Sequence, residues 1–491
     1  RPDPFRYEAV ESVSLIHSPI LNYTSMILKN LWALLALATA LSCTSTPKSE
    51  EPPQAILRGP IGQKLDAKLS PFVEQLRKEH DCPSSIAIGI TQGDSIIYAK
   101  AFGYANVEER DTADIYTLYA LASISKPVVA TAVVKLQEQG KLKLSDPVVK
   151  HLPYFRCADS TCQQITLLQL LTHTSGLPKN LRLHDWEHPS YDDDAPEQYV
   201  RSAKDTPLEF APGTDWGYSD VGFNILGDVI AKASGKSFEA YVEEQILRPS
   251  GMATATFTKP RELPSNWALP YIHALGTTAW KYYPYNRMYA PCTSLHANLV
   301  DMCQWGMTNL HHGSAAGNPV LNADSYDQLF KPWADTPWGQ QIGLSWFLQE
   351  YEGMKTIMHT GETIGFSTQL ILYPEEDICI VVLANRAYSR TARIANAAME
   401  IIKDLPVKPY QVSGRFPFMQ SWQAEGLDHA KILWKALLQD TTDNYYAGEW
   451  ELNLIGHALL FTEDYEEAKA AFDFNMELFP DSPNTYDSYG D

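Results

Sequence analysis

The sequence predicts an α+β fold in which one antiparallel sheet is assembled from both ends of a domain, with helices inserted between them. Five short runs rich in β-branched and apolar residues are typical of strands: 84–90, 95–102, 355–358, 365–373 and 377–384. Gln92-Gly93-Asp94 separates the first two runs and indicates a hairpin, and Pro374-Glu375-Glu376 forms a turn before the last run. Residues 140–260 read mostly as helices and polar loops, so strands at both ends enclose a helical insertion.

Upstream of this domain, Met26 opens a stretch with the layout of an export signal. Lys29 precedes an apolar run over residues 31–41, which is shorter than the roughly 20 residues needed to cross a bilayer. Ala40-Leu41-Ser42-Cys43 resembles a bacterial lipobox, so Cys43 is predicted to be lipidated, and cleavage after Ala40 is the alternative. These features predict an exported protein of the periplasm or cell envelope that is held at the membrane by a lipid.

The predicted organisation divides the 491 residues into six segments. They are an unstructured upstream extension (1–25), a lipoprotein-type signal peptide (26–43), a Ser/Thr/Pro/Glu-rich tether (44–60), the α+β domain (61–405), a Pro-containing linker (406–427) and a helical segment (428–491). An amphipathic pattern over 62–80 predicts the first helix of the domain. The net charge is −20 with no basic tract downstream of the signal, which argues against a nucleic-acid partner.

Residues 118–127 carry an S-x-x-K pair in Ser123 and Lys126. An apolar helical pattern follows as far as Gly140, and Pro127 fits only the first turn of such a helix, so Ser123 lies at or just before its N-terminus. The spacing puts the amine beside the hydroxyl. A neighbouring base activates a serine for nucleophilic attack, and the free N–H groups of a helix N-terminus suit a developing oxyanion. A helix cap followed by a surface lysine would give the same pattern.

Two further side chains have chemistry that suits a nucleophilic site. Tyr218 carries a phenol that can relay a proton once a cation lowers its pKa, although a tyrosine before a helix is more often a packing residue. His359 lies at the end of a predicted strand, where it can hydrogen-bond a substrate carboxylate or polar tail, although a lone histidine is more often structural. Together with the S-x-x-K pair, these residues predict a hydrolytic centre.

The chain from about 61 to 405 resembles the serine β-lactamase and penicillin-binding protein superfamily, and within it the class C β-lactamases, DD-peptidases and related esterases. The matching stretches are Ala122-Ser123-Ile124-Ser125-Lys126-Pro127, Leu170-Leu171-Thr172-His173-Thr174-Ser175-Gly176-Leu177-Pro178, Tyr218-Ser219-Asp220 with the seven residues after it, and His359-Thr360-Gly361 with Gly365-Phe366-Ser367. The resemblance implies a β-lactamase/transpeptidase-like fold, with an antiparallel sheet flanked by helices and a helical subdomain. It implies an acyl-enzyme that forms without a metal or other cofactor.

The same resemblance assigns roles to individual residues. It gives catalytic roles to Ser123, Lys126, Tyr218 and His359, and substrate-binding roles to Asp220, Thr360, Gly361 and Glu362. The strand after His359 would run beside the substrate. The N–H of Glu362 would pair with that of Ser123 as the oxyanion hole.

Asp220 departs from the family pattern, in which the second motif usually ends in Asn. An Asn amide can donate to a substrate carbonyl, whereas an ionised Asp can only accept hydrogen bonds. Asp220 should also pair with Lys126 and raise the pKa of that lysine, which moves the role of base toward Tyr218. The substitution puts amide recognition in doubt and leaves esters and other acyl substrates open.

Other patterns in the chain are weaker. His184-Asp185-Trp186-Glu187-His188 matches H-x-x-E-H, an inverted zinc-peptidase pattern, but it lies among prolines and aspartates that disfavour a helix, so no metal site is predicted. Of the seven cysteines, six would remain in an oxidising compartment if Cys43 is lipidated. Cys157 and Cys162 lie five apart in a short polar loop and are the pair best suited to a disulfide.

Residues 449–480 resemble a tetratricopeptide repeat. Leu452, Gly456, Leu459, Ala468, Phe472 and Pro480 fall at its signature spacings, and Gly490 follows Gly456 by one period of about 34 residues. An ordinary helical hairpin is the alternative. Since at least three repeats are usually needed for stability, either the chain is truncated or this tail docks onto the preceding domain. A repeat of this kind would offer a surface to a protein partner.

Two classes of function follow from these features. The first is an exported serine hydrolase that acts through a Ser123 acyl-enzyme on a β-lactam, a D-amino-acid peptide or an ester. The second is a catalytically idle fold that binds penicillin or peptidoglycan peptides as a sensor or scaffold. The joint presence of Ser123, Lys126, Tyr218 and His359 favours the enzyme, because a pure binder needs no proton relay.

Overall fold

The computed structural model describes residues 55–181, 185–274, 276–313, 319–442 and 444–490. Its centre is a nine-stranded antiparallel sheet with the order β1-β3-β2-β15-β14-β13-β12-β11-β10. The strands are β1 (Ala55–Leu57), β2 (Ile86–Gln92), β3 (Ser95–Phe102), β10 (Ala334–Asp335), β11 (Gln341–Ile342), β12 (Phe347–Tyr351), β13 (Met354–Thr363), β14 (Phe366–Tyr373) and β15 (Ile378–Ala384). Because β2 pairs with β15, the sheet joins both ends of the domain, which confirms the predicted α+β arrangement.

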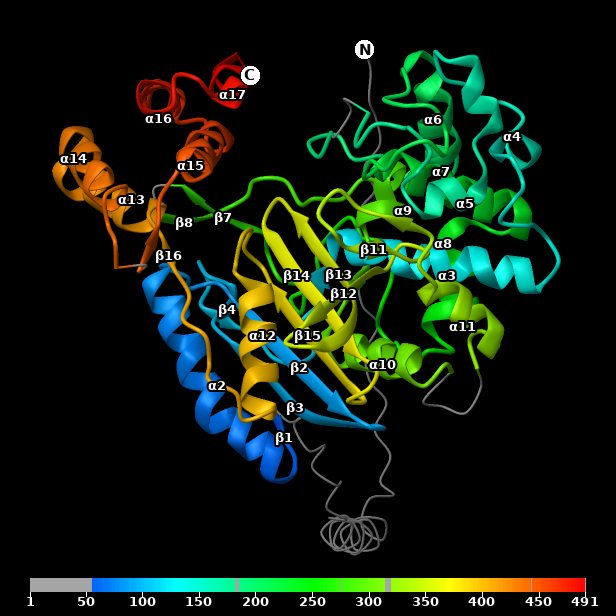
Figure 1. Ribbon diagram of the computed structural model, residues 1–491, viewed down its shortest axis with the longest axis horizontal. Coiled ribbons are helices and arrows are strands. Elements are labelled where there is room, and N and C mark those ends of the chain that lie inside the picture. Colours follow the sequence, from blue (N-terminus) through cyan, green and yellow to red (C-terminus); the bar gives the residue numbers. More distant parts are fainter. Residues whose placement is uncertain (1–54, 182–184, 275, 314–318, 443, 491) are drawn as a thin grey trace, which may run out of the picture. The chain divides into compact units, whose positions relative to one another are not determined.

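Helices cover both faces of this sheet (Figure 1). On one face, α2 (Gly59–Glu79) and α12 (Thr391–Ile402) pack on residues such as Ile88, Ile371 and Val382. On the other face, α3 (Ser125–Glu138) and α10 (Leu299–Leu310) share a core with Ala87 and Leu370. Successive residues of a strand point to opposite faces, so each central strand contributes to both cores and reads as a continuous apolar run.

The insertion between the two ends of the sheet is built from short helices and small ribbons. Its helices are η1 (Ala122–Ile124), α4 (Val148–His151), η2 (Ser160–Gln164), α5 (Leu167–Leu171), α6 (Ala195–Ser202), η3 (Ala203–Asp205), α7 (Asp220–Ser234), α8 (Phe238–Val242), η4 (Glu243–Leu247), η5 (Arg287–Tyr289), α9 (Ala290–Thr293) and α11 (Ala323–Phe330). Its ribbons are β4 (Tyr104–Asn106) with β5 (Asp111–Thr112), β6 (Tyr119–Ala120) with β9 (His296–Ala297), and β7 (Tyr271–Ala274) with β8 (Gly276–Ala279). The β6–β9 pair leads directly into η1 and so fixes where α3 begins.

After α12 the chain forms a helical tail with its own apolar core. The tail holds β16 (Val412–Ser413), α13 (Arg415–Glu425), α14 (Leu427–Leu437), β17 (Tyr445–Tyr446), α15 (Glu449–Phe461), α16 (Tyr465–Leu478) and α17 (Pro483–Gly490). Phe416 inserts between His80 and His273, with ring centroids 4.9 and 4.6 Å away, so the tail is docked on the rest of the molecule. The helices α13, α15 and α17 start 34 residues apart. The repeat assignment itself stays a prediction.

Three boundary or pairing predictions need correction. The tether was placed at 44–60, but residues 55–57 form β1 and α2 begins at Gly59, because Ile56 pairs with Ala99 of β3. The linker was placed at 406–427, but residues 415–425 form α13. Cys157 and Cys162 are not joined in the structure. All six cysteines of the described residues are free thiols, and the Cys157 thiol donates to the Asp159 carbonyl instead.

The predicted extension, signal peptide and lipidation site, Cys43 included, lie outside the described residues. Among the helices of the described residues, none combines the length and the apolar character needed to cross a bilayer.

Candidate active site

Ser123 and Lys126 meet where η1 passes into α3. Ser123 is partly exposed, whereas Lys126 is completely buried. The Lys126 ammonium donates to Ser123 Oγ at 2.9 Å and to the Cys292 carbonyl at 3.1 Å, and it lies 2.6 Å from Asp220 Oδ1. Two hydrogen-bond acceptors and one carboxylate therefore surround the ammonium and favour its charged form, in which the nitrogen has no lone pair with which to take a proton.

The backbone at the nucleophile is held in an uncommon conformation. Ala122 has φ = +48° and is fully buried, and a non-glycine residue in this region stores about 1–3 kcal/mol of strain. Ser125 secures the turn, because its hydroxyl donates to the Ala122 carbonyl at 2.7 Å and accepts from Leu295 N–H at 2.9 Å. The second serine of Ser-Ile-Ser-Lys thus supports the first, a role that its spacing alone does not reveal.

Asp220 is the first residue of α7, and its neighbour Ser219 caps that helix by accepting from Gly222 N–H at 3.1 Å. The expected ion pair with Lys126 is present. Burial alone would lower the pKa of Lys126, but the Asp220 carboxylate, together with Tyr218 and Cys292, outweighs it and holds that pKa above its usual value. The Asn180 amide nitrogen reaches the other carboxylate oxygen at 2.9 Å, so Asp220 is held on both sides.

Tyr218 lies over the same ammonium. Its ring centroid is 5.0 Å from Lys126 Nζ, and its phenol lies close enough to interact with both Lys126 and Ser123. The cation was expected to lower the phenol pKa. The Lys126 charge does lower this pKa, but burial raises it by more, so the pKa of Tyr218 lies above its usual value. The phenol is therefore protonated near neutral pH in the free protein.

His173 belongs to the site although it was noted only as part of a motif. Its ring stacks on Tyr218 at 4.4 Å between centroids, and its Nδ1 accepts from Ser219 N–H at 3.0 Å. Nε2 therefore carries the hydrogen of the neutral ring. Burial and the nearby Lys126 charge keep the pKa of His173 well below its usual value. The histidine orients the phenol and cannot add a second positive charge to the site.

His359 lies on β13 with 1% of its surface exposed. Its Nδ1 is 2.6 Å from the Thr360 carbonyl, which can only accept, so Nδ1 carries the hydrogen and Nε2 keeps a lone pair. Burial and the Lys126 charge lower the pKa of His359 to about 3. A neutral acceptor does not suit a carboxylate, so this geometry favours the other predicted partner of His359, a polar tail of the substrate. The ring instead suits a substrate group that donates a hydrogen bond.

Gly361 brings β13 against the nucleophile. A side-chain carbon at this position would lie 2.2 Å from the Leu121 carbonyl oxygen and 2.2 Å from Thr368 Oγ1, so only glycine fits. Thr368 also donates to the Leu121 carbonyl at 3.0 Å. The strand β12 pairs with β13 only as far as Met358, which leaves the outer edge from His359 to Thr363 without a partner strand.

Thr360 and Glu362 alternate with His359 and Gly361 along β13 and therefore face the other side of the sheet. Both line a cavity there, together with residues of α12 and of the tail. The Glu362 carboxylate accepts from Ser367 Oγ and from Tyr388 N–H, both at 2.7 Å. The structure thus brings Ser123, Lys126, Tyr218 and Asp220 into direct contact, sets His359 beside them, and turns the side chains of Thr360 and Glu362 away.

The H-x-x-E-H stretch does not form a cluster. His184 lies outside the described residues, and His188 bonds the adjacent Asp185 at the surface. Within the part of the chain that the structure describes, no three His, Cys, Asp or Glu side chains converge as metal ligands.

Comparisons with known proteins agree with this arrangement. The family model described as Beta-lactamase matches residues 69–402. The putative penicillin-binding protein PbpX of Bacillus subtilis (strain 168) is 28% identical over 250 residues, which cover 51% of this chain and 59% of PbpX. The esterase EstB of Burkholderia gladioli is 34% identical over 218 residues, which cover 42% of this chain and 55% of EstB. The chain thus spans less than two thirds of either relative.

A solved structure gives a similar result. The octameric penicillin-binding protein homologue from Pyrococcus abyssi matches with a TM-score of 0.61 at 27% identity, covering 69% of this chain and 77% of that one.

Proposed function

Because the chain belongs to the β-lactamase family, we propose that it is a serine hydrolase that forms an acyl-enzyme on Ser123. The observation that carries the proposal is the contact of Lys126 Nζ with Ser123 Oγ at 2.9 Å inside a fully buried charge network. A fold that binds its ligand without a covalent step does not need such a network around a partly exposed hydroxyl.

In this mechanism the proton of the Ser123 hydroxyl passes to the Tyr218 phenolate, which is the minor form at neutral pH because the pKa of the phenol is raised. Lys126 has no free lone pair, so it acts as a fixed cation beside the phenol. Ser123 Oγ then attacks the acyl carbon, the leaving group departs with a proton, and water hydrolyses the resulting ester to regenerate Ser123. The N–H groups of Ser123 and Glu362 hold the oxyanion.

Among the candidate substrates, esters suit the site better than β-lactams or D-amino-acid peptides. Asp220 can only accept hydrogen bonds, so it offers no donor to the side-chain carbonyl of an amide substrate. The lone pair on His359 Nε2 favours a substrate that carries a hydroxyl or N–H group beside His359. One of the relatives, EstB, is named as an esterase.

The test is Ser123→Ala assayed with p-nitrophenyl esters, a chromogenic cephalosporin and D-Ala-D-Ala peptides. Turnover should fall by about 10⁴–10⁶-fold while the protein stays folded. A fluorophosphonate should label the parent and not the variant, and a fluorescent penicillin should be released with time. Stable penicillin labelling without turnover of any substrate would support the non-catalytic binder instead.

Export and lipid anchoring at Cys43 complete the proposal and rest on the sequence alone. Expressed from Met26 in a Gram-negative host, the protein should be acylated at Cys43 and sediment with membranes. Cys43→Ser should abolish both. Unchanged processing and membrane association in that variant would mean that the lipobox interpretation is wrong.

A further inference from the structure

One acceptor of the Lys126 ammonium belongs to a very short helix. The Cys292 carbonyl accepts from Lys126 Nζ at 3.1 Å, and Cys292 lies in the four-residue helix α9. In a helix of this length, neither the N–H nor the carbonyl of the third residue has a partner within the helix. The position of this carbonyl therefore depends on what holds α9, and both α3 and α7 pack against it.

The helix α7 carries three residues that act on Lys126 or on α9. Asp220, Asn224 and Gly227 stand at positions i, i+4 and i+7, which share one side of a helix. All three are buried. Asp220 Oδ1 lies 2.6 Å from the Lys126 ammonium, whereas the next two residues meet α9. One face of α7 therefore reaches both the ammonium and the helix that supplies its carbonyl acceptor.

Asn224 holds the backbone of Cys292. Its side chain is almost completely buried, and its Oδ1 accepts from the Cys292 N–H at 3.3 Å. A buried N–H in the first turn of a helix needs an acceptor from outside that helix, and Asn224 supplies it. The same residue thus has its N–H fixed by α7 and its carbonyl turned to Lys126.

Gly227 allows α9 to lie this close to α7. A side-chain carbon at Gly227 would lie 2.1 Å from Pro291 Cγ and 3.0 Å from Pro291 Cβ. The proline ring is closed onto its own backbone, so it cannot turn aside as a flexible side chain would. Because Pro291 directly precedes Cys292, a shift that relieves this overlap would also move the carbonyl.

We propose that Asn224 and Gly227 are positioning residues of the active site, which fix the Cys292 carbonyl where it accepts from Lys126. The helix α7 then sets two neighbours of the ammonium, directly through Asp220 and indirectly through α9. Neither Asn224 nor Gly227 touches a reacting atom in this proposal. Its kinetic consequences rest on the proposed hydrolase function, whereas the geometry does not.

The consequence for the chemistry runs through Tyr218. The Lys126 ammonium lies 5.0 Å from the centroid of the Tyr218 ring, where its charge favours the phenolate and lowers the pKa of the phenol. If the Cys292 carbonyl moves away, the ammonium loses one of its acceptors and is held less firmly beside the phenol. The phenolate is then stabilised less, and the pKa of Tyr218 rises.

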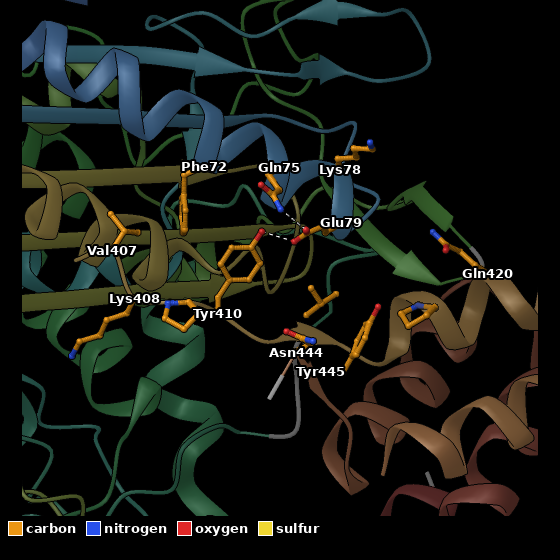
Figure 2. Close-up of a pocket in the computed structure, with 13 residues that line it drawn as sticks. Phe72, Gln75, Lys78, Glu79, Val407, Lys408, Tyr410, Gln420, Asn444 and Tyr445 are labelled. Carbon is orange, nitrogen blue, oxygen red and sulfur yellow. Dashed lines mark hydrogen bonds between the residues drawn. The ribbon is translucent and has the colours of Figure 1, made fainter. Parts of the chain in front are cut away.

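Two other side chains join separate elements by a similar hydrogen bond but away from the catalytic centre. Asn475 of α16 is fully buried, and its amide donates to the Glu449 carbonyl of α15 at 3.2 Å. Tyr410 donates to Glu79 and joins the segment after α12 to α2, beside a hollow of about 680 Å³ (Figure 2). No residue that lines this hollow belongs to the catalytic centre, so both bonds offer matched controls.

The experiment measures the pH dependence of one ester reaction in Asn224→Leu and in Gly227→Ala. The rise of kcat/KM with pH, followed from about pH 6 to 11, should move to higher pH in both variants. We expect about 0.5–1 unit, a fraction of the 1–3 units that a neighbouring charge can give. A small displacement of the site should lower kcat about tenfold or more, with KM changed less than about twofold.

A second readout needs no turnover. In protein labelled with ¹³C at tyrosine Cζ, the Tyr218 resonance, assigned with Tyr218→Phe, reports the pKa of the phenol directly. It should move upward in Asn224→Leu and in Gly227→Ala. Gly222→Ala in the same helix is the control for Gly227→Ala, because its added carbon meets Leu170 only at 3.4 Å and beyond.

The controls for Asn224→Leu are Asn475→Leu and Tyr410→Phe. Each removes a hydrogen bond between two elements and should lower Tm without moving the pH profile or the Tyr218 resonance. A role in stability alone therefore separates from a role in positioning Lys126.

A pH profile and a Tyr218 resonance at their parental positions in both variants would overturn the proposal, even if turnover fell, because the two residues would then act only through stability. An equal shift in the control variants would also overturn it. Gly227→Ala decides the matter if Asn224→Leu does not fold. If the parent hydrolyses no substrate but the Tyr218 resonance moves in both variants, the hydrolase proposal fails and the positioning role stands.

Discussion

Two buried cations stand near the start of two helices, and their surroundings are opposite. Lys126 at the start of α3 has three acceptors within 3.1 Å, and its charge is fully used inside the protein. The Arg415 side chain at the start of α13 has one carboxylate at 3.9 Å and lies over the rings of Tyr388 and Phe416, and its Nε has no hydrogen-bond partner among the described residues. Both side chains are more than nine-tenths buried.

The contrast is between a buried cation that has close acceptors inside the protein and a buried cation that lacks them. A buried cation with a full set of acceptors is stable and fixes its neighbours, here Ser123 and Tyr218. A buried cation whose one carboxylate lies 3.9 Å away loses hydration and recovers less of it inside the protein.

Removing each cation should give the largest difference in stability. Lys126→Gln leaves Asp220 without its cation and should lower the free energy of unfolding by about 3–5 kcal/mol, with loss of turnover on every substrate. Arg415→Gln gives up only the longer contact with Glu451 and the contacts with the Tyr388 and Phe416 rings, and should lower it by less than Lys126→Gln does. Urea unfolding of both variants measures this. Equal losses would mean that the acceptors around Lys126 add nothing.

Gly361 sets the distance between β13 and the nucleophile, so Gly361→Ala should be the next largest effect. The new carbon would overlap the Leu121 carbonyl and Thr368, and the strand must move away from Ser123. A displacement of about 1 Å can lower turnover about 100-fold. Gly222→Ala is the control, because its added carbon meets Leu170 only at ordinary contact distances of 3.4 Å and beyond. Similar activity in both variants would remove Gly361 from the positioning of the site.

The sheet and the first motif could be read from sequence because their signals are local. Alternating or continuous apolar runs predicted β2, β3, β13, β14 and β15, and the spacing of Ser123 and Lys126 predicted their contact. The partners of Lys126 were harder to predict, because the Cys292 carbonyl comes from a segment 166 residues away. No pattern marked that carbonyl as part of the site.

The pKa of Tyr218 and the tautomer of His359 could not be predicted from the sequence either. The pKa of Tyr218 depends on the balance between its burial and the charges of Lys126 and Asp220. The acceptor character of His359 depends on one contact with the Thr360 carbonyl. The start of α13 was included in the Pro-containing linker, although Pro417 lies in the first turn of this helix, where proline is tolerated.

Asp220→Asn tests the charge network around Lys126 through the pH dependence of kcat/KM. The Asp220 carboxylate raises the pKa of Lys126 and of Tyr218, so its removal should lower both, by about 1–3 units. If the Tyr218 phenolate is the base, kcat/KM rises as pH increases through its pKa, and this rise should move to lower pH in the variant. We would measure one ester and one cephalosporin from about pH 5 to 10 in both proteins. The new amide donor should also favour the cephalosporin relative to the ester. An unchanged profile and ratio would mean that the Asp220 charge does not influence the reaction.

Ser125→Ala should give the smallest effect, because it removes support from the nucleophile without touching the reacting atoms. The Ala122 carbonyl and the Leu295 N–H would each lose a buried partner, which costs about 1–3 kcal/mol in unfolding free energy. Turnover should fall by less than about tenfold, since Lys126 still holds Ser123. Ser202→Ala removes a hydroxyl that bonds the Tyr199 carbonyl at a partly exposed helix end, where water can replace it, and should cost under about 0.5 kcal/mol. If Ser125→Ala instead lost more than 100-fold in turnover at unchanged stability, the hydroxyl would be moving a proton in the reaction, and the strained turn at Ala122 would need another source of support.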